Sequence, residues 1–89
     1  MKIFYTTQFK KDYKRIKKQQ RDIGKLISVI DQLVSTQSLE KKYQTHMLIG
    51  TWKDHMDCHI EPDWILIFKL TEDALILERT GSHSELFKK

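Results

Sequence analysis

The sequence has a single cysteine and no long apolar run, and each shortage excludes a class of protein. Cys58 alone forms no internal disulfide and cannot supply the four thiolates of a structural zinc site. The longest uninterrupted apolar stretch, Trp64 to Phe68, falls far short of the roughly 20 residues that a membrane-spanning helix needs. The segment that opens with Met1 contains no apolar signal region. We therefore expect a protein of the reducing cytoplasm that is neither exported nor inserted in a membrane.

The length of 89 residues and the uneven charge narrow the possibilities further. A chain this short builds one hydrophobic core, so we expect a single domain spanning residues 1–89. The net charge is +4, but eight basic and only two acidic residues lie between Lys10 and Lys25, and the rest of the chain is slightly acidic. A solvated helix face is the commoner reason for a run of charge. The concentration on one segment also suits a polyanion or an acidic partner, and the residues expected to bind RNA are then Lys14, Lys17 and Lys18.

The spacing of apolar residues predicts an α+β domain with the element order βααβββ. The predicted strands cover residues 2–5, 56–60, 64–70 and 74–80, and the predicted helices cover residues 8–18 and 23–34. Thr6 or Thr7 can cap the first helix. Short turns make the last three strands antiparallel, and the helices, expected as an antiparallel pair, cover one face of the sheet because nothing else can bury it. Residues 39–53 are predicted to be irregular.

The second of the three antiparallel strands has two apolar faces. Trp64, Leu66 and Phe68 point one way along it, and Ile65 and Ile67 point the other way. A strand with this pattern is covered on both sides. We therefore expect it at the centre of the sheet.

The second half of the chain contains four histidines, His46, His55, His59 and His83. RNA needs no external nucleophile for cleavage, because the ribose 2′-OH can attack its own phosphodiester. The reaction needs a base for that hydroxyl, an acid for the departing 5′ oxygen, and positive charge near the phosphate. Histidine titrates at about pH 6.5, so one copy can accept a proton while another, beside a carboxylate such as Asp63, donates one. The clustered histidines therefore predict an acid–base site for RNA cleavage.

Two alternatives to a nuclease site stay open for these histidines. Any single histidine is more often a surface or hydrogen-bonding residue than a catalyst. A zinc site could be built from His55, Asp57, His59 and His83, although their spacing matches no familiar zinc pattern.

The remaining unusual side chains are assigned by their surroundings. Cys58 is expected to be a buried strand residue rather than a nucleophile, because nothing nearby in the sequence would stabilise a thiolate. Trp52 and Trp64 are expected in the core. Phe87 follows the last strand in a polar tail, where its ring can pack against a nucleobase.

Three segments closely resemble one known family. They are Tyr43 to Lys53 (YQTHMLIGTWK), Asp57 to Phe68 (DCHIEPDWILIF) and Glu78 to Phe87 (ERTGSHSELF), and the sequence FKKD at Phe9 to Asp12 adds to them. Together they resemble the YafQ subgroup of the RelE-like toxins, which are the toxin halves of bacterial type II toxin–antitoxin pairs. The resemblance extends over nearly the whole chain, and the combination of HIEPDW with TGSHSELF is specific.

The resemblance implies a RelE-like fold and a ribosome-dependent mRNA endonuclease that inhibits translation. It implies that no metal and no cofactor take part. The implied partners are mRNA on the ribosome, ribosomal RNA, and a DinJ/RelB-type antitoxin that wraps around the toxin. DNA would be contacted only indirectly, through the complex with the antitoxin.

By their positions in the motifs, four residues resemble the acid–base set of the family: His46, His59, Asp63 and His83. His83 matches the general acid, and either His46 or His59 is the base. Phe87 matches the aromatic residue that helps to place the substrate. Trp64 is next to Asp63 and is expected to shape the pocket.

Some residues fall outside the pattern of the family. His55 matches no catalytic position, so we expect it at the surface. Ser84 and Glu85 lie at positions that vary in the family. Lys88 and Lys89 extend past the usual end of the family and would touch RNA or nothing.

Two alternative functions come from other classes of protein. One is a non-enzymatic toxin like the ParE branch, which binds and inhibits gyrase and lacks this histidine set. The other is a small DNA-binding domain, which the basic segment permits but no recognition-helix motif supports. The histidines favour the nuclease, since a pure binding protein has no need for several of them around one pocket.

Overall fold

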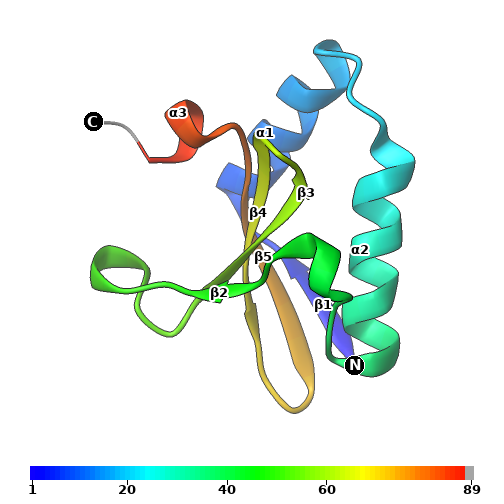
Figure 1. Ribbon diagram of the computed structural model, residues 1–89, viewed down its shortest axis with the longest axis vertical. Helices are drawn as coiled ribbons and strands as arrows, with labels where there is room; N and C mark the ends of the chain where they lie inside the picture. The colour runs from blue at the N-terminus through cyan, green and yellow to red at the C-terminus, as the bar shows by residue number, and fades with distance from the viewer. Residues whose placement is uncertain (88–89) are drawn as a thin grey trace.

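The computed structural model describes residues 1–87, which form a five-stranded sheet with a pair of helices on one face (Figure 1). The elements are β1 (Lys2–Tyr5), α1 (Thr7–Lys18), α2 (Ile23–Thr36), β2 (His46–Met47), β3 (Met56–Glu61), β4 (Trp64–Leu70), β5 (Ala74–Gly81) and α3 (His83–Leu86), with 3-10 turns at Lys41–Tyr43 and Gly50–Trp52. The strand order is β1-β5-β4-β3-β2. The predicted α+β class is confirmed. Lys88 and Lys89, for which an RNA contact was considered, lie outside the described residues.

Side-chain caps define where the two long helices begin. The hydroxyl of Thr6 accepts a hydrogen bond from the backbone N–H of Phe9 at 2.9 Å, so Thr6 is the cap of α1. The carboxylate of Asp22 accepts from the N–H of Gly24 at 3.0 Å at the start of α2. That helix ends at Gln37, whose φ of 56° places it in the left-handed region. No helix within residues 1–87 has the length and apolar character to cross a membrane.

The central strand β4 is covered on both faces, as its sequence predicts. Trp64 and Phe68 are fully buried in the core that the sheet shares with α1 and α2. Ile65 and Ile67 pack on the other face against Leu86 of α3. Figure 1 shows α2 on one side of the sheet and α3, with the loop that follows β2, on the other.

β1 runs parallel to β5 but reaches only as far as Leu77, which leaves the second half of β5 at the sheet edge. α1 covers this edge through Asp12, a fully buried carboxylate. Its Oδ2 accepts hydrogen bonds from the backbone N–H of Thr80 at 3.1 Å and from Nε of Arg79 at 2.7 Å, and its Oδ1 accepts from Nη1 of Arg15 at 3.0 Å. Burial opposes ionisation, but these hydrogen bonds and the arginine charges outweigh it and hold the pKa of Asp12 below its usual range.

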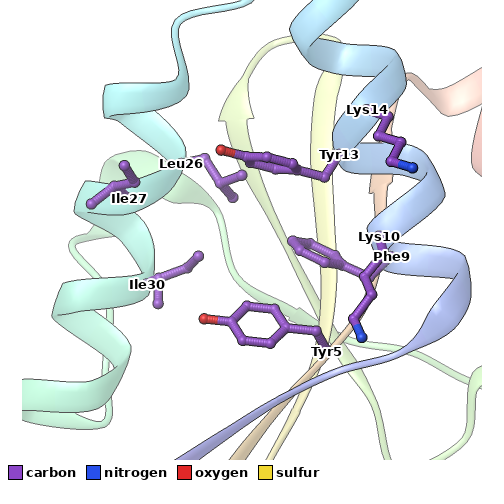
Figure 2. Close-up of a pocket in the computed structure, with 8 residues that line it drawn as sticks. All are labelled: Tyr5, Phe9, Lys10, Tyr13, Lys14, Leu26, Ile27 and Ile30. Carbon is purple, nitrogen blue, oxygen red and sulfur yellow. The ribbon is translucent and has the colours of Figure 1, made fainter.

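An open apolar groove separates α1 from α2 (Figure 2). Its residues are Tyr5, Phe9, Lys10, Tyr13, Lys14, Leu26, Ile27 and Ile30. Tyr5 and Ile27 are each about half exposed. The groove contains none of the histidines, so it is separate from the predicted catalytic residues.

Two short elements were not predicted. β2 is a two-residue strand inside the segment expected to be irregular, and it pairs with β3 so that His46 lies opposite Asp57. α3 is a single turn of four residues that follows Ser82. Elements this short have no apolar periodicity to detect, because a period of 2 or 3.6 needs several repeats to be visible.

Candidate active site

Five of the predicted site residues meet on the sheet face that α1 and α2 leave free. His46 comes from β2, His59 from β3 and Asp63 from the β3–β4 turn, while His83 begins α3 and Phe87 follows it. The ring centres of His46 and His59 are 6.1 Å apart, those of His59 and His83 are 5.4 Å apart, and those of His83 and Phe87 are 6.4 Å apart. We call His46, His59 and His83 the histidine row.

Asp63 holds the backbone and the ring of His83 at once. Its Oδ1 accepts a hydrogen bond from the backbone N–H of His83 at 3.0 Å and another from Nδ1 at 2.8 Å. These two hydrogen bonds, together with the charge of the imidazole, hold the pKa of the Asp63 carboxyl below its usual range. An ionised carboxylate only accepts, so Nδ1 carries a proton and Nε2 is the nitrogen left to exchange one with a substrate.

At the other end of the row, His46 lies beside a buried acidic residue. Its Nδ1 is 3.5 Å from Oδ1 of Asp57, and that oxygen has no hydrogen-bond partner among the described residues. Asp57 is buried, whereas the side chain of His46 is 60% exposed. Sequence reasoning considered Asp57 only as a zinc ligand and missed this contact. The pairing of β2 with β3 is the signal that would have revealed it.

His59 is the most enclosed member of the row. It sits opposite Ile65 in the β3–β4 pairing, which fixes its side chain on the face away from α1 and α2. Its Nδ1 is buried and has no hydrogen-bond partner among the described residues. His59 thus contacts both of its histidine neighbours from a fixed strand position.

Trp64 does not join this group, although it was expected to shape the pocket beside Asp63. Its side chain is fully buried on the helix face, where Nε1 donates to the hydroxyl of Thr80 at 2.9 Å and the guanidinium of Arg21 lies 5.4 Å from the ring centre. A buried indole cannot touch a substrate, so any effect of Trp64 on the pocket passes through the backbone of β4.

The three predicted RNA-binding lysines are also apart from the histidine row. Lys14, Lys17 and Lys18 are exposed on α1, in the layer on the opposite face of the sheet. Nζ of Lys17 lies 5.6 Å from the ring centre of Tyr13. The lysines can therefore contact a large polyanion such as the ribosome, but they cannot contact a phosphate that is bound at the histidine row.

The prediction that His55 is a surface residue is wrong. Only 17% of its side chain is exposed. Its Nε2 lies 2.9 Å from a carboxylate oxygen of Glu78, its Nδ1 lies 3.0 Å from the carbonyl oxygen of Lys53, and its ring meets Trp52 edge-on. These contacts fasten the loop before β3 to β5, which gives His55 a structural role.

The zinc alternative finds no support in the geometry. Within residues 1–87, no three histidine, cysteine, aspartate or glutamate side chains are placed to hold a metal ion. Cys58 is fully buried, and burial together with the neighbouring charge of Asp57 raises the pKa of its thiol to about 12. Such a thiol is not a nucleophile, which confirms Cys58 as a buried strand residue.

Comparison with known proteins agrees with this geometry. The mRNA interferase toxin YafQ of Escherichia coli K12 is 45% identical over 86 residues, which are 96% of this chain and 94% of that protein. YafQ in the crystal structure of the E. coli DinJ–YafQ complex superposes with a TM-score of 0.89 at 44% identity and 96% coverage of both chains. A metal-bound toxin from Helicobacter pylori also superposes with a TM-score of 0.89, at 39% identity and with coverage of 98% of this chain and 99% of that one.

A family model places the chain as a whole. The model for YafQ, described as a bacterial toxin of type II toxin–antitoxin systems, matches residues 1–88. The fold of the relatives, their identity over nearly the full chain and this match agree with the resemblance that the sequence motifs carry. The chain therefore belongs to the YafQ family of bacterial toxins of type II toxin–antitoxin systems.

Proposed function

We propose that this toxin is a ribosome-dependent mRNA endonuclease that cleaves RNA through attack of the ribose 2′-OH, with His83 as the general acid. The observation that carries the proposal is the pairing of His83 with Asp63 at the end of the histidine row. The name mRNA interferase, which the E. coli relative bears, supports the same class of reaction. It also favours the nuclease over the alternative of a ParE-like gyrase inhibitor.

In the proposed reaction the 2′ oxygen attacks the adjacent phosphorus and the bond from phosphorus to the 5′ oxygen breaks. The leaving 5′ oxygen takes a proton from Nε2 of His83, while His46 or His59 accepts the proton of the 2′-OH. Asp63 keeps the ring of His83 oriented through its two hydrogen bonds. The products are a 2′,3′-cyclic phosphate, which water can open to a 3′-phosphate, and a free 5′-OH.

Phe87 and the basic face of α1 serve substrate placement in this proposal. Phe87 is half-buried beside His83, so a base next to the cleaved bond can stack on its ring. Lys14, Lys17 and Lys18 would contact ribosomal RNA on the far side of the sheet, and such phosphate contacts weaken as salt is added. The toxin would act in the cytoplasm, where the translating ribosomes are.

The partner proposed for this toxin is a DinJ-type antitoxin, which the complex of DinJ with E. coli YafQ supports. The basic segment 10–25 would attract acidic side chains of such a partner. Co-expression with the neighbouring open reading frame should give a stable complex and restore growth.

The reaction is proposed to need no metal, since the protonated imidazole supplies the acid. Similar toxins from H. pylori have been crystallised with bound metal, so the metal requirement of cleavage needs a direct test. Cleavage should persist in EDTA when the magnesium that the ribosome itself requires is controlled for. If EDTA abolishes cleavage and added zinc or copper restores it, that result would contradict a metal-free reaction.

The decisive experiment compares His83→Ala with the wild type in bacteria and on purified translating ribosomes. Loss of one placed acid–base group typically costs about 10²–10⁴ in rate, so the variant should bind antitoxin and yet fail to arrest growth. Glu72→Ala is the control, because it removes an exposed side chain from the β4–β5 turn, outside the row. Growth arrest by His83→Ala at equal expression, or 5′-phosphate ends on the fragments, would overturn the assignment.

A further inference from the structure

α3 carries the proposed acid but cannot hold itself in place. It is one turn of four residues, shorter than any helix that is stable alone. Its buried apolar residue is Leu86, which packs against the sheet. Asp63 in the β3–β4 turn accepts two hydrogen bonds from its first residue, His83. The remaining polar contacts of its first turn therefore decide how α3 is oriented.

Glu85 makes those contacts in two directions. Toward the start of α3, its Oε1 accepts a hydrogen bond from the backbone N–H of Ser82 at 2.8 Å, while the hydroxyl of Ser82 accepts from the N–H of Glu85 at 3.3 Å. This reciprocal pair is a capping box. Toward α1, its Oε2 accepts from Nε2 of Gln19 at 3.2 Å and lies 3.0 Å from Nε of Arg15. One carboxylate thus joins α3 to α1.

The arginine on the other side of this contact is itself fixed. Nη1 of Arg15 donates to the buried Asp12 and Nη2 donates to the carbonyl oxygen of Thr80, at 3.0 and 2.9 Å. A Cβ atom at Gly81 would lie 2.5 Å from Nη2 of Arg15 and 2.8 Å from Oε1 of Glu85, so only glycine leaves room for both side chains. The ion pair of Arg15 with Glu85 therefore connects the buried edge of β5 to α3.

The charge of Glu85 suits this position. Partial burial opposes ionisation, but hydrogen bonds from Ser82 and Gln19 and the charge of Arg15 outweigh it and hold the pKa of Glu85 below its usual range. The carboxylate is thus ionised at neutral pH and offers both oxygens as acceptors.

We infer that Glu85 is a positioning residue for RNA cleavage, because with Arg15 it holds α3 against α1 and so keeps the imidazole of His83 in the histidine row. The inference rests on the proposed function. Glu85 does not touch the imidazole, and it lies at a position that varies in the family, so the role belongs to this chain's own contacts. A misplaced acid costs rate without preventing the substrate from binding.

The test measures cleavage and order in the same variants. Glu85→Ala removes the capping box and the contact with α1, and its single-turnover cleavage rate on programmed ribosomes should fall by about 10–100-fold with little change in ribosome affinity. Glu85→Gln keeps the acceptor that the capping box needs but loses the second oxygen that faces Arg15 and Gln19, so its rate should lie between those of Glu85→Ala and the wild type. Glu72→Ala removes an exposed carboxylate from the β4–β5 turn and should behave like the wild type.

Heteronuclear NOE measurements on residues 82–87 of the free proteins provide the second readout. They should fall in Glu85→Ala, fall less in Glu85→Gln and stay near wild-type values in Glu72→Ala. A wild-type cleavage rate in Glu85→Ala would overturn the inference, and so would a reduced rate in a variant whose α3 keeps its order. If the wild-type protein does not cleave RNA, the proposed function fails and takes the catalytic role of Glu85 with it, while the NOE values report separately on whether Glu85 holds α3.

Discussion

The contact between Asp63 and His83 allows charge and geometry to be separated by substitution. Both hydrogen bonds from His83 end on the same oxygen, Oδ1. Asparagine offers a carbonyl oxygen in that position, so Asp63→Asn can keep the two hydrogen bonds and lose only the charge. Asp63→Ala loses the charge and the two hydrogen bonds. The two variants should therefore differ in rate.

The expected magnitudes follow from exposure. The side chains of His83 and Asp63 are 54% and 69% exposed, so solvent screens their charges and an exposed pair is worth at most about fivefold in an equilibrium. Asp63→Asn should thus slow cleavage at neutral pH by about fivefold or less. Asp63→Ala frees the imidazole to rotate, and loss of orientation costs about 100-fold.

Single-turnover cleavage of mRNA on purified ribosomes, followed as a function of pH, measures both effects. The gap between wild type and Asp63→Asn should close as pH falls toward the pKa of the Asp63 carboxyl, which is held below its usual range, because the wild type then loses the charge as well. Added salt should narrow the gap between wild type and Asp63→Asn, since it screens the charge that distinguishes them. Equal rates for Asp63→Asn and Asp63→Ala would refute the reasoning, because Oδ1 would then have no role as a positioned acceptor.

Two further predictions concern the helix side of the sheet. Substituting glutamate for Lys14, Lys17 and Lys18 should weaken ribosome binding. It should also lower the slope of log binding constant against log salt concentration by about 0.7–0.9 for each lost phosphate contact. Unchanged pelleting of the variant with ribosomes would remove this face from the proposal. Asp12→Ala should destabilise the fold by about 3 kcal/mol in urea unfolding, the low end for breaking a buried ion pair, because the arginines partly reach solvent. The pKa of Asp12 is lowered in the folded state, so its contribution is complete above the pKa of the unfolded chain and is lost as pH falls through the folded value. Wild type and Asp12→Ala should therefore converge in stability in acid, and a constant difference between them would contradict the ionised assignment.

Much of the fold could be predicted from local pattern. The two long helices, the three longest strands and the central place of β4 each depend on several repeats of an apolar period, which a single sequence displays. The acid–base residues could be proposed because their chemistry and motif spacing are visible in the chain. The short elements β2 and α3 were not predicted, because they contain too few residues to display an apolar period.

The contacts that assemble the site are tertiary contacts between residues distant in the sequence. The contact of His83 with Asp63 spans 20 residues and that of Arg79 with Asp12 spans 67, and neither separation appears in a local pattern. Only the folded chain placed Trp64 on the helix side of β4. Sequence alone therefore determined the kinds of side chain and the elements that carry them, whereas the packing of the sheet decided which of them meet, because contacts between distant residues depend on strand register and layer order.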